Sequence, residues 1–190
     1  MKFRTACLVA LLAAVSAPAF AHPGHDGSGF LHPFAGMDHL LAMVGVGMWA
    51  WLLAAKQRSA AVLVPAAFVV MMALGAAAGF AGIKLPLEEA AILASVFLIG
   101  GLVLAAVRPS TVTAMAVVGL FAVFHGYAHA IEAPSGNPAT YMLGFLGATA
   151  LLHAAGIGLG WLAQRAMGSV GLRALGGLIV AGGALILAAQ

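Results

Sequence analysis

Six long apolar stretches constrain the fold of this chain more than any other feature of its sequence. Each has close to the ~20 residues that an α-helix needs to cross the hydrocarbon core of a bilayer. Short polar or proline-containing segments separate them. The pattern predicts an all-α, polytopic membrane protein in which residues 37–190 form a six-helix transmembrane bundle. The stretches cover residues 37–55, 60–82, 87–107, 111–132, 139–163 and 171–189.

Charged side chains are too few to cover a water-facing surface. Hydrophobic residues make up 64% of the chain and charged residues 7%, whereas about 25% of residues are charged in a typical globular protein. The lysines and arginines stand singly between the apolar stretches, which excludes a basic patch for nucleic acid. We therefore expect the lipid bilayer, and no nucleic acid, as a partner.

Residues 1–21 have the three parts of a cleaved signal peptide. Lys2 and Arg4 form a positive region, a short apolar core follows, and residues 19–21 form a small-x-small cleavage site. The alternative is an uncleaved first membrane helix, but the apolar core is too short to span ~30 Å of hydrocarbon. Cleavage would leave His22 as the mature N-terminus.

The lysines and arginines between the apolar stretches predict the orientation in the membrane. With the mature N-terminus outside, only Lys84 falls outside, which agrees with the signal-peptide prediction. We therefore expect a protein of the bacterial inner membrane with both termini periplasmic, in which residues 22–36 form a histidine-containing periplasmic segment. The basic residues expected inside are Lys56, Arg58, Arg108, Arg165 and Arg173.

Glycines recur at spacings that favour close contact between membrane helices. We expect them to remove side-chain bulk where helices cross, which is a structural role that needs no ligand. The motifs are Gly45-x-Gly47, Gly75-x-x-x-Gly79 and Gly156-x-x-x-Gly160.

The fourth apolar stretch carries His125, His129 and Glu132. Spacings of four and then three place all three side chains on one face of a helix. Two histidines one turn apart can hold a divalent ion, with Glu132 as a third ligand or as a hydrogen-bond partner that orients a histidine. The alternative is that these histidines only bond to neighbouring helices. Ionisable groups in hydrocarbon are costly, and three on one face favour metal binding.

His32, Asp38 and His39 stand where the first apolar stretch begins. A regular helix starting at Pro33 would place the two histidines ~10.5 Å apart along its axis. One ion with bonds of ~2.1 Å cannot be held by both. Either the backbone is irregular between Pro33 and Gly36, or the histidines serve successive sites. Asp38 is also placed to act as a helix N-cap, a role that does not exclude metal contact.

The remaining histidines fall between the predicted outer surface and the bilayer centre. His22, His25 and Asp26 could capture a metal ion at the surface, or could have no measurable role. Met43 and His153 are candidates for a path through the bundle. Imidazole and carboxylate donors without thiolate suit nickel, cobalt, zinc or cupric copper, and the donor set alone does not choose among these ions.

Two blocks of the sequence resemble the HupE/UreJ proteins, and the similarity covers essentially the whole chain. This family comprises bacterial secondary permeases for nickel, some of them for cobalt, that are associated with hydrogenase and urease. The larger nickel–cobalt transporter family has a shorter gap between the histidine and aspartate of its motif, which favours the HupE/UreJ group. The blocks read His32-Pro33-x-x-Gly36-x-Asp38-His39-x-x-x-Met43-x-x-Val46-Gly47 and His125-Gly126-Tyr127-Ala128-His129-x-x-Glu132.

The resemblance implies a permease with Ni²⁺ or Co²⁺ as its transported substrate, no prosthetic group and no enzymatic activity. The nickel would be supplied for hydrogenase or urease maturation. The family's important residues would carry over as a first-helix group and a fourth-helix group. They are His32, Asp38 and His39, and His125, His129 and Glu132.

We therefore expect secondary transport of a divalent metal ion, driven without ATP. The chain lacks the Gly-x-x-x-x-Gly-Lys-Ser/Thr loop of nucleotide-binding proteins, so no nucleotide-binding subunit is implied. The residues also leave open a membrane-embedded metal-dependent hydrolase, although Gly126 stands where His-Glu-x-x-His places its general base. A metal sensor or assembly protein that binds without transport is a third interpretation, and the oligomeric state is left open.

Overall fold

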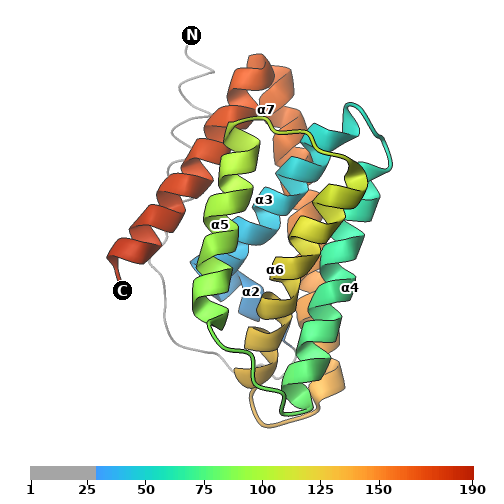
Figure 1. The fold of residues 1–190 in the computed structure, drawn as a ribbon, viewed down its shortest axis with the longest axis vertical. Helices are drawn as coiled ribbons and strands as arrows, with labels where there is room; N and C mark the ends of the chain where they lie inside the picture. The colour runs from blue at the N-terminus through green and yellow to red at the C-terminus, as the bar shows by residue number, and fades with distance from the viewer. Residues whose placement is uncertain (1–28) are drawn as a thin grey trace.

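The computed structural model describes residues 29–190, and every regular element in this part of the chain is an α-helix (Figure 1). The predicted signal peptide and the tail residues His22, His25 and Asp26 lie outside the described residues. The helices form an elongated bundle with their long axes roughly aligned. They are α2 (His32–Ala35), α3 (Met37–Ala54), α4 (Ala60–Phe80), α5 (Glu88–Leu104), α6 (Thr111–Ile131) and α7 (Pro138–Ala188).

The element α7 contains two of the six predicted helices. Gly168 interrupts it with φ 64° and ψ −151°, a conformation that only glycine adopts readily. The chain turns back there, as the fold at one end of the bundle shows (Figure 1). The separator expected between residues 163 and 171 is therefore present, and the predicted six-helix bundle is confirmed.

Four of the helices that the structure describes are long and apolar enough to cross a membrane: α3, α4, α6 and α7. The 17-residue α5 lies at the short end of the range for a spanning helix, which is about 17–25 residues. Together with the break in α7, this gives a polytopic helical membrane protein, as predicted.

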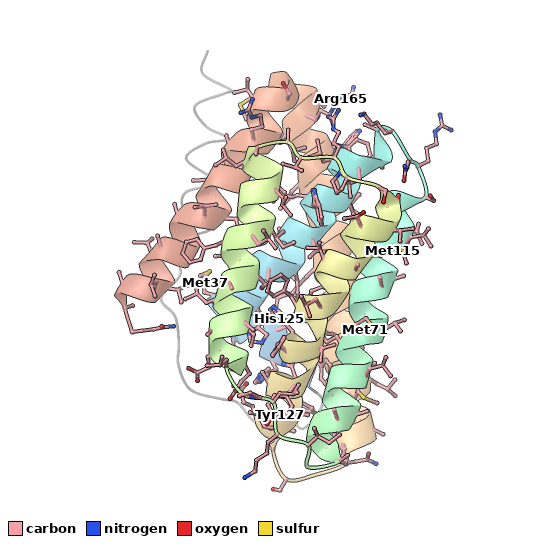
Figure 2. All side chains as sticks on the ribbon, viewed as in Figure 1. Met37, Met71, Met115, His125, Tyr127 and Arg165 are labelled. Carbon is pink, nitrogen blue, oxygen red and sulfur yellow. The ribbon has the colours of Figure 1, made fainter. Side chains whose placement is uncertain are left out.

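Charges divide between the two ends of the bundle. At one end, which we call the arginine end, Arg58 and Arg165 line one surface hollow, and Lys56 and Arg108 line another. Arg173 donates to the carbonyl of Leu104 at the same end. At the opposite end, the histidine end, lie the turn between α4 and α5, which contains Lys84, and the end of α6 (Figure 1). The four acidic residues of the described chain are at helix termini on this side: Glu88 and Glu89 in the first turn of α5, Glu132 at the end of α6 and Asp38 in the first turn of α3. Figure 2 shows Arg165 at the arginine end, Tyr127 toward the histidine end, and His125 between them.

Close backbone contacts hold the helices in pairs. The helix α4 packs most extensively on α6, and α3 on α7. A Cβ atom at Gly126 would collide with the carbonyl oxygen of Met72, and one at Gly47 with that of His153. Glycine therefore permits these two crossings, as expected for membrane helices. The contacts bring the histidines of α3, α6 and α7 together in the interior.

Candidate functional site

The site begins at a break in the first helix region. The short α2 ends at Ala35, Gly36 is extended with φ −89° and ψ 115°, and α3 begins at Met37. The structure shows the irregular backbone of one of the two alternatives from the sequence, which does not exclude the other, that His32 and His39 serve successive sites. The break lets His32 turn toward the end of α6, where its Nε2 lies 3.0 Å from the carboxylate of Glu132.

Four histidines, beginning with His32, form a continuous series of ring contacts. The ring of His32 lies 4.9 Å from that of His129, and the ring of His39 lies 4.7 Å from His129 and 4.9 Å from His125, centroid to centroid. We call His32, His39, His125 and His129 the histidine file. The structure therefore brings together the two predicted groups, one from α2 and α3 and the other from α6.

Asp38 orients the histidine that follows it. Its Oδ1 accepts hydrogen bonds from the backbone N–H of His39, at 2.7 Å, and from the ring Nδ1 of His39, at 2.8 Å. The N-cap of α3 is Gly36, and no side chain caps that helix. The N-cap role considered for Asp38 is therefore wrong, because the helix begins before it. Since a carboxylate only accepts, the Nδ1 of His39 donates, and its Nε2 has no partner in the protein.

Ser95 orients His125 in the same way from α5. The Ser95 hydroxyl donates to the carbonyl of Ile92 at 2.6 Å. Its oxygen lies 3.0 Å from the Nε2 of His125. Because the one hydroxyl proton is used by the carbonyl, His125 must donate from Nε2. The lone pair of His125 Nδ1 is therefore available.

His153 on α7 lies deeper along the same interior. Its Nδ1 lies 2.8 Å from the carbonyl oxygen of Met43 and must donate to it, so its Nε2 also keeps a lone pair. The ring of Phe68 contacts both the file and this histidine, at 5.5 Å from the ring of His125 and 5.0 Å from that of His153. His153 therefore lies close to the file, and one apolar ring contacts both.

These free nitrogens are buried and have no hydrogen-bond partner in the protein. Five of the six unpartnered buried side-chain polar atoms in residues 29–190 are histidine nitrogens, and the sixth is the Tyr141 hydroxyl. An unsatisfied buried polar group costs about 1–3 kcal/mol, and native proteins contain few of them. At His39, His125 and His153 the other ring nitrogen is fixed by an acceptor, which is the usual state of a metal-binding histidine, whereas at His129 neither nitrogen has a partner. The nitrogens are His39 Nε2, His125 Nδ1, both nitrogens of His129, and His153 Nε2.

The side chains of the histidine file are not arranged around one common metal position. Within the described residues, no three His, Cys, Asp or Glu side chains are placed to hold one ion. The file therefore offers neighbouring donors in succession. Such an arrangement suits an ion that must leave as readily as it enters, because conduction requires several weak sites rather than one tight one.

Sequence reasoning missed Ser95, which bonds to His125 from another helix, and Thr149, which contacts the sulfurs of Met43 and Met72. Ser95 is the only hydroxyl-bearing residue in the stretch 87–107, and Thr149 stands four residues before His153. For Ser95, a single hydroxyl in an otherwise apolar stretch was the available signal, and for Thr149 it was the spacing of four to His153. Their partners lie 30 residues away for Ser95 and 106 for Thr149, so the contacts depend on the packing of the bundle. Phe68 and Met72 carried no such signal, since both side chains are typical of ordinary packing.

Comparison with known proteins agrees with the resemblance found in the sequence. The family described as HupE / UreJ protein matches residues 9–186. The chain belongs to the HupE/UreJ family. It is 45% identical to Protein HupE of Rhizobium leguminosarum bv. viciae over 184 residues, which cover 93% of this chain and 94% of that protein. No solved structure matches this member of the HupE/UreJ family.

Proposed function

We propose that the protein is a secondary permease that moves Ni²⁺, and also Co²⁺, across the bacterial inner membrane along the histidine file. The observation that carries the proposal is the set of buried histidine nitrogens that have no hydrogen-bond partner in the protein. A structural core would gain nothing from leaving these polar atoms unpaired. A divalent cation passing along the file would satisfy them in turn.

The identity of the ion follows from the donors together with the family. The file offers imidazole nitrogens, with the carboxylates of Asp38 and Glu132 beside it. Such donors suit nickel and cobalt. The family resemblance adds that the nickel would be supplied for hydrogenase or urease maturation. The similarity to Protein HupE extends over nearly the whole chain.

The distribution of charge supports entry at the histidine end. The acidic residues gather there, whereas five of the six basic residues of the described chain lie at the arginine end. With the arginine end in the cytoplasm, a cation meets negative charge where it enters. The membrane potential then contributes ~2.3 kcal/mol per charge per 100 mV, or about twice that for a divalent ion. This drives uptake without ATP.

Accumulation of ⁶³Ni in cells at limiting nickel tests the proposal. Cells making the wild type should accumulate nickel, and cells making His39→Ala should fall to the level of cells without the protein, because the variant removes a donor from the middle of the file. Leu143→Ala is the matched control, since that side chain is 70% exposed on the helix surface, and it should transport like the wild type. Equal accumulation in all strains would refute the permease. Nickel binding by the purified protein without accumulation would identify a sensor or assembly protein instead.

The contact between Ser95 and His125 predicts a second result. Ser95→Ala removes the acceptor that holds the proton on His125 Nε2, so the free lone pair is no longer fixed on Nδ1. Loss of such an orienting partner typically weakens metal affinity by about 10–100-fold. We expect the nickel concentration for half-maximal uptake to rise by that factor. Ser95→Thr, which keeps a hydroxyl, should recover much of the affinity, and no difference between the two variants would argue against this role.

A further inference from the structure

A second group of donor atoms lies around His153, whose ring contacts that of Phe68. His153 and Thr149 stand one turn apart on the same face of α7. The Thr149 hydroxyl lies 3.3 Å from the sulfur of Met43 on α3 and 3.8 Å from the sulfur of Met72 on α4. Three helices therefore converge here. We call His153, Thr149, Met43 and Met72 the inner cluster.

All four side chains of the inner cluster are buried. Met43, Met72 and Thr149 have no exposed surface, and His153 is 1% exposed. His153 is fixed by its bond to the Met43 carbonyl, and its Nε2 has no protein partner. Thr149 has only thioether sulfurs as side-chain hydrogen-bond partners, which are weak acceptors. The cluster thus contains an imidazole nitrogen without a protein partner, near two thioether sulfurs that accept only weak hydrogen bonds from Thr149.

Packing alone does not account for this combination. Methionines commonly fill gaps in apolar cores, and Met43 and Met72 taken singly would need no other role. A buried imidazole with an unpaired nitrogen costs free energy that an apolar side chain would not. The Phe68 ring contacts both this histidine and His125, so the inner cluster adjoins the histidine file.

We propose that the inner cluster is a second binding station for the transported ion, next to the histidine file and joined to it by the ring of Phe68, which contacts both His125 and His153. This inference rests on the proposed permease function. His153 Nε2 supplies the nitrogen donor, and the thioethers of Met43 and Met72 supply soft donors. The Thr149 hydroxyl is released from the sulfurs when they bind the ion. Because thioethers favour softer cations over hard ones, the inner station selects Ni²⁺ and Co²⁺ against Mn²⁺ and Mg²⁺.

The test uses the full-length protein in proteoliposomes with an inside-negative potential and a metal-sensitive dye inside. The Met43→Leu/Met72→Leu double variant removes both sulfurs while conserving volume, a change that cores tolerate well. His153→Gln removes the imidazole. We expect Ni²⁺ influx to fall at least about tenfold in each, by analogy with the loss of other metal-site partners. Equilibrium dialysis with ⁶³Ni should show that the detergent-solubilised variants still bind Ni²⁺ at the histidine file, because the residues of the file are unchanged. The double variant should also lose preference for Ni²⁺ over Mn²⁺.

Met71→Leu is the matched control. This neighbouring methionine on α4 packs toward Gly119, so its influx and selectivity should equal those of the wild type. Influx and selectivity equal to the wild type in the double variant would refute the inner station but not the proposed permease function. The double variant is sufficient for this test even if His153→Gln does not fold. Absence of Ni²⁺ influx through the wild type would instead overturn the permease and the station together.

Discussion

Replacing Gly126 with alanine should destabilise the bundle by about 3 kcal/mol or more, at the upper end of the range for overpacked cores. The added Cβ would collide with the carbonyl oxygen of Met72 and would lie 2.9 Å from the backbone nitrogen of Ala76. These atoms belong to the backbone of α4, so no side-chain rotation relieves the clash. We expect a large fall in the melting temperature of the detergent-solubilised protein. Nickel uptake should fall with it, because Gly126 lies next to His125, at the point where α6 packs against α4.

Gly147→Ala provides the matched comparison. Gly147 also lies within a membrane-spanning helix, but a Cβ at that position meets nothing within 4 Å. Alanine there should be neutral or should stabilise α7 by up to ~1 kcal/mol through its higher helix propensity. Equal melting temperatures for the two variants would show that α4 and α6 do not approach as closely as the structure has them.

The helices were predictable because their length and apolarity are local properties of the sequence. The second stretch, expected over residues 60–82, is α4 (Ala60–Phe80), and the fourth, expected over 111–132, is α6 (Thr111–Ile131). The reversal inside α7 was also predictable, since glycine and polar residues separate the last two stretches. In a bilayer the backbone must bond to itself, so an apolar stretch of this length leaves little choice but a helix.

The site was only half predictable. Spacing alone placed His125, His129 and Glu132 on one helix face, and the irregular backbone near Gly36 was one of the two arrangements that the sequence allows. That His39 contacts both α6 histidines depends on how α3 crosses the bundle, which no local pattern encodes. The metal-binding roles of these residues stay predictions. The fixed proton positions on His125 and His153 were invisible in the sequence, because their acceptors lie on other helices.

His129→Leu should change stability and transport in opposite directions. His129 is fully buried, and neither ring nitrogen has a protein partner. Leucine has a similar volume and no polar atom, so it removes two desolvated groups without leaving a large cavity. Each unsatisfied group costs about 1–3 kcal/mol, partly offset by loss of the stacking on Phe145, whose ring lies 4.7 Å away. We expect a higher melting temperature together with nickel uptake at the level of cells without the protein.

His125→Leu, one turn earlier on the same helix, separates the two effects. It removes only one unpaired nitrogen and also breaks the hydrogen bond to Ser95. Uptake should therefore be lost as in His129→Leu, with little or no gain in melting temperature. If His129→Leu melted below the wild type, the His129 ring would have to make interactions that stabilise the resting fold. If it melted higher and still accumulated nickel, His129 would lie outside the path. Higher stability with lost uptake would show that the chain keeps a destabilising histidine in its core because the passing ion needs it.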